Sequence, residues 1–187
     1  MRNKLTKINL GSGTNIKEGY INIDFKKSDG CEIVHNLNLF PWPIENESCT
    51  EVLAENVLEH LDNFILAMEE IHRICQDNAL VKISVPYWNS SFAYIDPTHK
   101  RGFHELTFSF FDPDAKYCKE RPYYSNARFK VVAFSYVIAP FQPYRSLPFV
   151  KQIEIKNKIM KKIFGILGNL FSNIILELRM ELKRVKK

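Results

Sequence analysis

Short apolar segments alternate with polar, turn-rich segments along the first half of the chain. In residues 20–24, polar side chains alternate with isoleucines, which predicts a strand with one buried face. Residues 80–85 are largely apolar and end at Pro86, a pattern typical of a central strand that is buried on both faces. The same reasoning predicts further strands at residues 7–10, 32–35 and 51–54.

A helix is predicted between the strands at residues 51–54 and 80–85. Its apolar positions recur at spacings of three and four: Ile65, Met68, Ile71 and Cys75. Asp62 is the expected N-cap, because its carboxylate can accept a hydrogen bond from the first turn, and Asp77-Asn78 is the expected end of the helix. Strands that alternate with helices favour an α/β fold with a mostly parallel sheet in three layers, resembling a Rossmann fold.

The second half of the chain contains an aromatic segment and a predicted hairpin. Residues 87–124 are rich in Phe, Tyr, Pro and His and follow the carboxyl end of a strand, where open sheets bind ligands. We therefore expect them to form a loop or lid over an acceptor. Residues 129–138 and 176–185 are expected to pair as a C-terminal antiparallel hairpin. A helix from about 151 to 172 would separate them, with an apolar stripe at Met160, Ile163, Leu167, Leu170 and Ile174.

These elements fit a single domain that spans residues 1–187. The chain is long enough to bury a core, and its content of 45% hydrophobic and 25% charged residues is that of an ordinary globular protein. Within the domain we expect a cofactor-binding core at residues 5–86. The acceptor loop would occupy residues 87–124, and the C-terminal hairpin with its helix would occupy residues 129–187.

Cysteine usage and hydropathy limit the compartment and the class of protein. The four cysteines form no Cys-x-x-Cys pair, which disfavours a disulfide framework or a zinc cage, so no metal site is predicted and a reducing cytoplasm is expected. Residues 1–10 lack the apolar core of a secretory signal. The longest uncharged run, residues 163–176, is shorter than the roughly 20 residues of a membrane span.

Positive charge is concentrated near the C-terminus. The net charge of the chain is +5, whereas residues 151–187 hold ten Lys and Arg against three Glu. This basic tail is a candidate contact for anionic lipid or phosphate, and an ordinary solvated basic face is the alternative. The remaining residues are slightly acidic in sum, which disfavours a nucleic-acid partner.

Glycines follow the first predicted strand, and an acidic residue ends the second. Gly11 and Gly13 allow the backbone to approach a ligand closely, and Asp24 is placed to bind ribose hydroxyls. A nicotinamide-binding domain is disfavoured, because its Gly-x-Gly-x-x-Gly motif would need a glycine where this chain has Ile16. Asp24 also follows Gly13 too closely for a full helix to lie between them.

Four motifs in succession resemble those of class I S-adenosylmethionine-dependent methyltransferases of the type 11 group. They are Asn9-Leu10-Gly11-Ser12-Gly13, Gly19-Tyr20-Ile21-Asn22-Ile23-Asp24, Asn56-Val57-Leu58-Glu59-His60-Leu61 and Ser84-Val85-Pro86. The segment 96–103 is similar to a compact branch of that group that is often linked to surface-glycan and lipopolysaccharide biosynthesis. The resemblance covers about residues 5–112.

The resemblance implies S-adenosylmethionine as cofactor and assigns positions to contact it. Gly11, Ser12 and Gly13 would lie against the methionine part and Asp24 against the ribose. Further positions that the resemblance implies are Asn36 and Leu37 near the adenine, and Glu55 and Asn56 near the sulfonium, at the start of the acceptor pocket.

The chain departs from the family pattern at three places. Asn15 stands where many relatives have a third glycine, and Asn36 replaces a common acidic residue. Asp77-Asn78 replaces a Pro-Gly-Gly turn, and asparagine tolerates the left-handed conformation that such a turn needs.

Histidines are the candidate catalytic residues. An acceptor hydroxyl must lose its proton during methyl transfer, and the pKa of histidine suits a general base. His60 follows the fourth strand and acts either as this base or as a residue that orients the loop. His99 lies beside Asp96, Lys100 and Arg101 and is either a base next to anion-binding groups or an ordinary turn residue. His104 precedes several phenylalanines that favour core packing.

The preferred hypothesis is therefore an S-adenosylmethionine-dependent methyltransferase that acts on a small-molecule or glycan acceptor, including a lipid-linked one. A peripheral contact with anionic membrane through the basic tail is part of this hypothesis, and the oligomeric state stays open. The alternative is a noncatalytic module with the same fold that binds a membrane or a protein through that tail.

Overall fold

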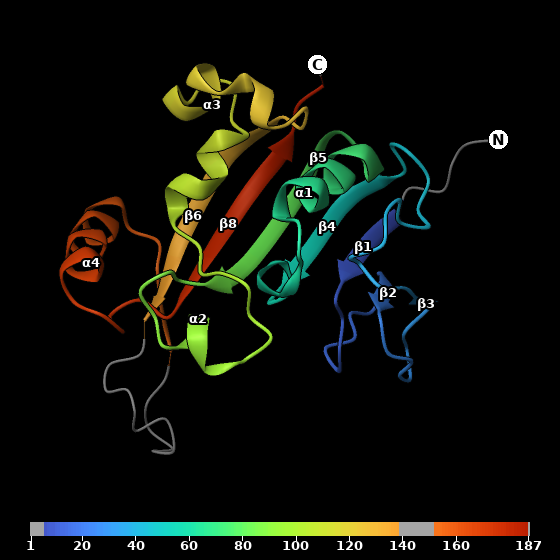
Figure 1. Cartoon of the computed structure of the whole chain (residues 1–187), viewed down its shortest axis with the longest axis horizontal. Coiled ribbons are helices and arrows are strands. Elements are labelled where there is room, and N and C mark those ends of the chain that lie inside the picture. The colour runs from blue at the N-terminus through green and yellow to red at the C-terminus, as the bar shows by residue number, and fades with distance from the viewer. Residues whose placement is uncertain (1–5, 139–151, 187) are drawn as a thin grey trace.

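An eight-stranded mixed sheet runs through the whole protein, with strand order β3-β2-β1-β4-β5-β8-β6-β7 (Figure 1). The computed structural model describes residues 6–138 and 152–186. The strands are β1 (Thr6–Leu10), β2 (Ile21–Asp24), β3 (Ile33–Val34), β4 (Cys49–Glu55), β5 (Cys75–Pro86), β6 (Phe129–Ile138), β7 (Ile153–Ile155) and β8 (Glu177–Arg184). The helices are α1 (Phe64–Ile74), α2 (Phe92–Ile95), α3 (Lys116–Glu120) and α4 (Lys158–Leu170), with short 3-10 turns η1 (Leu58–His60), η2 (Glu105–Phe110) and η3 (Pro122–Tyr124).

The predicted α/β class and mixed sheet are confirmed. Strands β1 to β5 run parallel to one another, and β8 pairs antiparallel with both β5 and β6. The predicted C-terminal hairpin is therefore present as β6 and β8. The parallel strands align their carboxyl ends at one edge of the sheet, so the segments that follow β1 and β4 lie close together.

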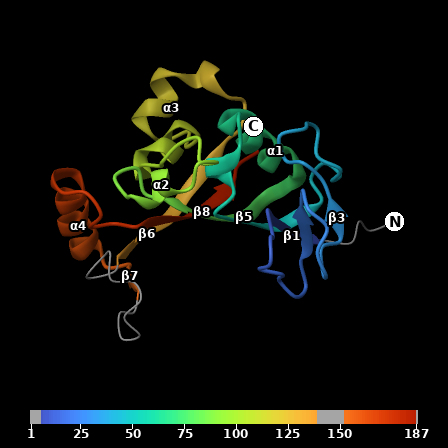
Figure 2. The same cartoon turned by 60° about the horizontal axis from the view of Figure 1, so that its bottom comes forward.

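The helices of the described residues cover one face of the sheet rather than two. Figure 2 shows α1, α2 and α3 on the same side, with α4 beside the edge formed by β6 and β7. On the opposite face, side chains such as Lys82 and Glu181 lie opposite each other on β5 and β8, and Glu181 is exposed. The expected third layer is missing here because residues 11–20 and 25–32, which connect β1, β2 and β3, are too short to hold a packed crossover helix.

The boundaries of α1 differ from the prediction at both ends. Asn63, not Asp62, is the N-cap, and its side chain accepts a hydrogen bond from the Leu66 amide at 3.0 Å. The helix ends at Ile74, and Asp77-Asn78 lies within β5 instead of terminating the helix. Asn78 has a φ of 62° and lies where the pairing register between β4 and β5 shifts. An asparagine adopts this left-handed conformation more readily than most residues, and here it forms part of a β-bulge.

Much of the aromatic segment 87–124 packs into the core. The ring of Phe64 in α1 lies 5.1, 5.9 and 5.7 Å from the rings of Phe103, Phe108 and Phe111, and all three of those side chains are buried. These residues fix the segment to the helix-covered face of the sheet. The part of the segment around α2 carries exposed side chains and borders the candidate site.

The helix α4 is shorter than predicted. Asn157 caps it by accepting hydrogen bonds from the amides of Ile159 and Met160, while Ile153–Ile155 forms β7 against β6. The predicted start at residue 151 lies outside the described residues. Gly165 and Gly168 face Tyr136 and Ile175, and Phe164 packs against the core.

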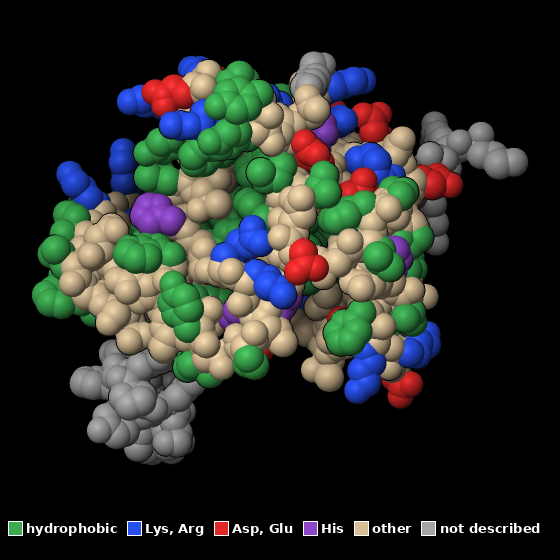
Figure 3. Space-filling model, viewed as in Figure 1, with side chains coloured by type: hydrophobic (Ala, Val, Ile, Leu, Met, Phe, Trp, Pro, Cys, Tyr) green, Lys and Arg blue, Asp and Glu red, His purple; other side chains and the backbone are tan. Residues whose placement is uncertain are grey.

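Three of the five residues of the predicted apolar stripe are exposed, namely Met160, Ile163 and Leu170, as are Ile159 and Ile166. Leu167 is half-buried, and Ile174 lies beyond the end of α4 and packs against the core. Figure 3 shows hydrophobic side chains at the left edge of the molecule, where α4 lies. Within the described ranges, no helix combines the length and hydrophobicity that a membrane span requires.

Candidate functional site

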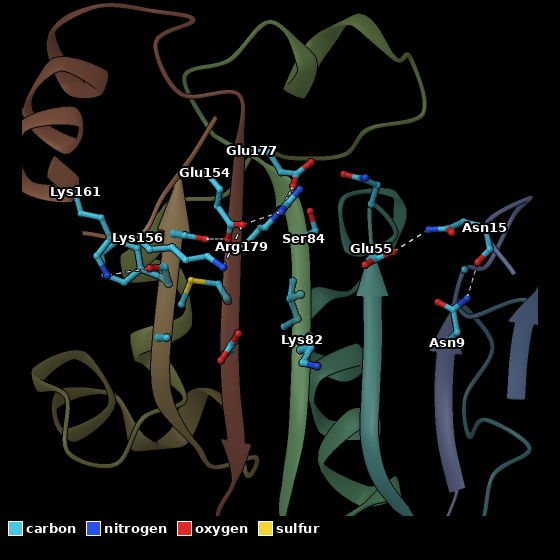
Figure 4. A pocket seen from close by; sticks show the side chains of 18 of the residues that line it. Asn9, Asn15, Glu55, Lys82, Ser84, Glu154, Lys156, Lys161, Glu177 and Arg179 are labelled. Atoms are coloured by element: carbon cyan, nitrogen blue, oxygen red, sulfur yellow. Dashed lines mark hydrogen bonds and ion pairs between the residues drawn. The ribbon is translucent and has the colours of Figure 1, made fainter. Parts of the chain in front are cut away.

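A groove of about 700 Å³ crosses the helix-free face at the carboxyl ends of β1 and β4 (Figure 4). One end is lined by the backbone turn after β1 and by Glu55 and Asn56 at the end of β4. The other end is lined by charged side chains from β7, α4 and β8. Four of the residues predicted to bind the cofactor line this groove: Gly11, Ser12, Glu55 and Asn56.

The turn after β1 is held by its glycines and by Asp24. Gly11 and Gly13 have φ of 62° and 50°, the left-handed region that glycine adopts without strain. The Asp24 carboxylate accepts hydrogen bonds from the Gly13 amide at 2.8 Å and the Lys26 amide at 3.0 Å. Asp24 is almost fully buried, and each of its oxygens keeps a second lone pair for another donor.

Asn15 ties this turn to β4. Its amide nitrogen donates to Glu55 Oε2 at 2.8 Å, and Lys17 Nζ lies 3.0 Å from the same oxygen. The Asn15 side chain therefore holds the Glu55 carboxylate at the rim of the groove, an interaction that a glycine at this position could not make. Asn56, which follows, has φ of 52°, and its amide donates to the Ser84 carbonyl.

The turn after β1 has an unpartnered polar atom and open space that a polar ligand could fill. The hydroxyl of Ser12 is buried and has no hydrogen-bond partner among the described residues. A Cβ added to Gly13 would meet nothing within 4 Å, so space is open beside that backbone. A buried polar atom without a partner costs free energy, and a ligand with polar groups, such as the methionine part of S-adenosylmethionine, would satisfy it.

The predicted adenine contacts lie elsewhere. Asn36 is exposed, and its side chain accepts a hydrogen bond from the Asn38 amide. Leu37 is buried in the core, and its carbonyl accepts the indole N–H of Trp42 at 3.0 Å. Neither residue lines the groove, and neither do Gly13 and Asp24. Their assignment to the cofactor stays a prediction.

Charged pairs line the far end of the groove. Arg179 donates to Glu177 Oε1 at 2.7 Å and to Glu154 Oε2 at 3.3 Å. Lys161 donates to the Phe134 carbonyl, and its ammonium lies 4.0 Å from the centre of the Phe134 ring. Lys156 also pairs with Glu154, and Glu181 lines the same end, so acidic and basic groups are balanced there and suit an acceptor with hydroxyl groups.

A second hollow of about 350 Å³ adjoins the groove, since Asn56 and Glu177 line both. His60 and His99, the two predicted catalytic residues, both line this hollow, with α2 forming part of its wall. Their ring centres lie 4.6 Å apart. The structure thus brings together two histidines that are far apart in sequence, and it places them next to the groove. His104 instead caps η2 by accepting a hydrogen bond from the Leu106 amide.

Sequence reasoning missed Glu59 between them. Its side chain is fully buried, its carboxylate oxygens have no partner among the described residues, and Oε1 lies 4.0 Å from His99 Nε2. Burial raises the pKa of Glu59 to about 8, and burial together with His99 lowers the pKa of His60. No local pattern signals this burial, because it depends on residues 96–100 folding back over η1, where the Lys100 amide donates to the Glu59 carbonyl.

Solved structures with this fold include S-adenosylmethionine-dependent methyltransferases. One from Archaeoglobus fulgidus is 16% identical, with a TM-score of 0.59 over 97% of this chain and 87% of that chain. One from Thermotoga maritima is 13% identical, with a TM-score of 0.58 over 98% of this chain and 83% of that chain. The [4+2]-cyclase SpnF is 8% identical, with a TM-score of 0.56 over 98% and 75% of the two chains.

The sequence matches no protein-family model and no curated protein. The likeness therefore lies in the fold, and because this fold also carries a cyclase, the fold alone does not fix the reaction. Over nearly its full length, the chain has the α/β fold of S-adenosylmethionine-dependent methyltransferases.

Proposed function

We propose that this protein is an S-adenosylmethionine-dependent methyltransferase whose cofactor lies at the β1 and β4 end of the groove. The observation that carries the proposal is the meeting of Gly11, Ser12, Glu55 and Asn56 around one space at the carboxyl edge of the sheet. Open α/β sheets bind their ligands at this edge. When bound, S-adenosylmethionine supplies a methyl group on a positively charged sulfur.

In this proposal, the residues of the groove hold and orient the cofactor. The buried Ser12 hydroxyl and the nearby backbone would bind polar groups of its methionine part, and Asp24 would bind the ribose beside the turn. The Glu55 carboxylate, held by Asn15 and Lys17, would stabilise the positive sulfonium side. Alignment of donor and acceptor in such a site can supply about 7–11 kcal/mol of the barrier reduction.

We infer that the acceptor is a hydroxylated small molecule or a glycan. The hollow beside the groove combines the polar groups of Glu59, His60 and His99 with the apolar Phe92 and Ile95. This mixture suits a sugar-like molecule, which presents hydroxyls at its edges and carbon faces between them. The balanced acidic and basic groups at the far end of the groove can accept hydrogen bonds from hydroxyls of the same acceptor and donate hydrogen bonds to them.

Release of S-adenosylhomocysteine tests this proposal. The protein is incubated with S-adenosylmethionine and a panel of nucleotide sugars and lipid-linked glycans, and both the released product and the methylated acceptor are measured. We expect acceptor-dependent release. In Glu55→Gln it should fall by about tenfold or more, because a hydrogen bond to a charged group contributes about 1.5–3 kcal/mol.

Glu51→Gln is the matched control. Glu51 lies on the same strand, where it binds Lys7 and Lys82, and it does not line the groove. Its rate of release should stay close to that of the wild type. If the rate of release fell equally in both variants, Glu55 would have no specific role in cofactor binding. If no hydroxylated acceptor stimulated release of S-adenosylhomocysteine, the proposed acceptor class would be wrong.

A second function, docking on anionic membrane, is favoured by the exposed stripe of α4. Ile159, Ile163 and Ile166 follow one another on the outer side of the helix, and Lys158 and Lys162 lie beside them, also exposed. Apolar side chains bordered by lysines are typical of helices that lie in the headgroup region of anionic bilayers. Such a contact would bring the active site to a lipid-linked acceptor.

Charge reversal tests the membrane contact without truncating the fold. Sedimentation with vesicles that contain anionic lipid should show binding by the wild type and at least a tenfold loss in the double variant Lys158→Glu, Lys162→Glu, since each lysine near the surface contributes about 1 kcal/mol. Added salt should weaken wild-type binding. Equal, salt-independent binding of both proteins would contradict an electrostatic contact.

A further inference from the structure

A carboxylate that pairs with no lysine or arginine of the described residues lines the second hollow. Glu59 is 0% exposed, and neither of its oxygens has a hydrogen-bond partner among the described residues. Nearby basic groups point elsewhere, because Lys100 pairs with Asp62 and Arg101 donates to the carbonyls of Leu61 and Asp62. A buried charge in this state is unfavourable unless a cation joins it or it takes up a proton.

Two imidazoles face this carboxylate. One donor atom from each of Glu59, His60 and His99 lies within 4.8 Å of the other two, so a point exists within about 2.8 Å of all three. Ligand distances at a zinc ion are about 2.0–2.2 Å, and modest side-chain rotations would close this difference. The Nε2 atom of His99 lies 4.0 Å from Glu59 Oε1, so this nitrogen of the ring faces the carboxylate.

His60 is oriented as metal-ligating histidines usually are. Its Nδ1 atom lies 2.8 Å from Thr98 Oγ1, and the Thr98 hydroxyl donates to Asp96 Oδ1 at 2.6 Å. A chain from imidazole through hydroxyl to carboxylate fixes the ring and directs Nε2 toward a ligand. In metal sites, such a partner for the second ring nitrogen selects the neutral, metal-binding form of the imidazole.

The surrounding charges favour a cation. Two further carboxylates, those of Asp96 and Glu177, line the same hollow as Glu59. A divalent cation would offset the carboxylates and bind the neutral rings directly.

We propose that Glu59, His60 and His99 bind a divalent metal ion of the zinc class. One carboxylate and two imidazoles form a common ligand set for zinc at catalytic sites, and three protein ligands leave a position open for water or a substrate oxygen. The ion would border the hollow that we assign to the acceptor. A hydroxyl bound to it would lose its proton more readily than a free hydroxyl.

This inference changes the role of the two histidines. They would act as ligands of an ion and not as free general bases, and an acceptor hydroxyl would meet the ion. The role of the ion in methyl transfer rests on the proposed function, whereas metal binding itself does not. The two can be separated, because cofactor binding is measured in the presence of a chelator and metal binding in the absence of cofactor.

Direct titration tests the site. The full chain, first treated with a chelator and then freed of it, is titrated with Zn²⁺ by calorimetry and with Co²⁺ by visible absorption. We expect one ion per chain and a Co²⁺ spectrum typical of nitrogen and carboxylate ligands. Affinity should fall about 100-fold or more in Glu59→Gln and His99→Ala, and about tenfold in Thr98→Val, which removes the partner of His60.

His35→Ala is the matched control. His35 lies outside the cluster and contacts the Leu39 carbonyl, so its loss should leave Zn²⁺ affinity unchanged. Circular dichroism confirms that each variant is folded. The proposal is overturned if the folded wild type binds no Zn²⁺ stoichiometrically, or if His99→Ala binds it as tightly as the wild type.

Discussion

At the scale of single residues, Gly11 shows how one position shapes the rim of the groove. Its φ of 62° is unfavourable for other residues, and a Cβ added there would lie 2.4 Å from Cγ2 of Val57. Gly13 has a similar φ, of 50°, but open space around it. The two glycines therefore separate the effect of backbone conformation from the effect of packing.

Replacing each glycine with alanine tests this difference. Gly13→Ala should reduce the free energy of unfolding by about 1–2 kcal/mol, the usual cost of a left-handed alanine. Gly11→Ala should reduce it by about 2–5 kcal/mol, because overpacking against Val57 adds to that cost. Urea denaturation of both variants measures the difference, and equal losses would contradict the close approach between Gly11 and Val57.

The residues of the site were predictable to different degrees. The resemblance to methyltransferases implied that Gly11, Ser12, Glu55 and Asn56 lie near one ligand, and they do line one groove, because they stand at the carboxyl ends of the neighbouring strands β1 and β4. Glu59 could not be predicted, because its burial comes from a segment some 40 residues away that covers η1.

At the scale of elements, a charged cluster anchors the connection between β3 and β4 to α1. Glu70 of α1 accepts hydrogen bonds from the Trp42 amide at 2.9 Å and from Arg73 at 2.7 and 2.8 Å. Arg73 in turn donates to the carbonyls of Ile44 and Trp42. Burial raises the pKa of Glu70, but these hydrogen bonds outweigh it, so the pKa lies below its ordinary value.

The lowered pKa predicts how the cluster depends on pH. A carboxylate of this kind stabilises the fold above its unfolded pKa, and this contribution is lost as the pH falls through its lower, folded value. Glu70→Gln should therefore be less stable than the wild type by about 1–3 kcal/mol at pH 7, with a difference that shrinks at acid pH. Urea denaturation across this range measures it, with the exposed Glu45→Gln as control. A loss that did not change with pH would contradict the ionic role.

The lengths of the connections explain which elements could be predicted. The strands followed from short local patterns, either alternation, as in residues 20–24, or a continuous apolar run, as in residues 80–85, whose last residues are buried consecutively in β5. The prediction of a third layer was wrong for the described residues, because the connections before and after β2 are short and hold no helix that could cover the second face of the sheet. The sequence did not decide which face of α4 packs against the sheet. Gly165, Gly168 and the half-buried Phe164 face the protein, whereas Met160, Ile163 and Leu170 are exposed.

At the scale of the whole molecule, the exposed face of the sheet sets this protein apart from a three-layer fold. The groove runs across this face from the turn after β1 to the charged pairs of β7 and β8, and the hollow with Glu59, His60 and His99 opens beside it. This places a candidate cofactor space and a candidate acceptor space next to each other. The central claim is that the first space binds S-adenosylmethionine.

Titration calorimetry with S-adenosylmethionine and S-adenosylhomocysteine tests that claim most directly. The wild type should bind each with one site per chain. Asp24→Asn should bind at least about tenfold more weakly, because it loses the charged acceptor beside the turn, while the exposed Asp29→Asn should match the wild type. No binding by the folded wild type at millimolar ligand would contradict the account and favour a noncatalytic module with this fold.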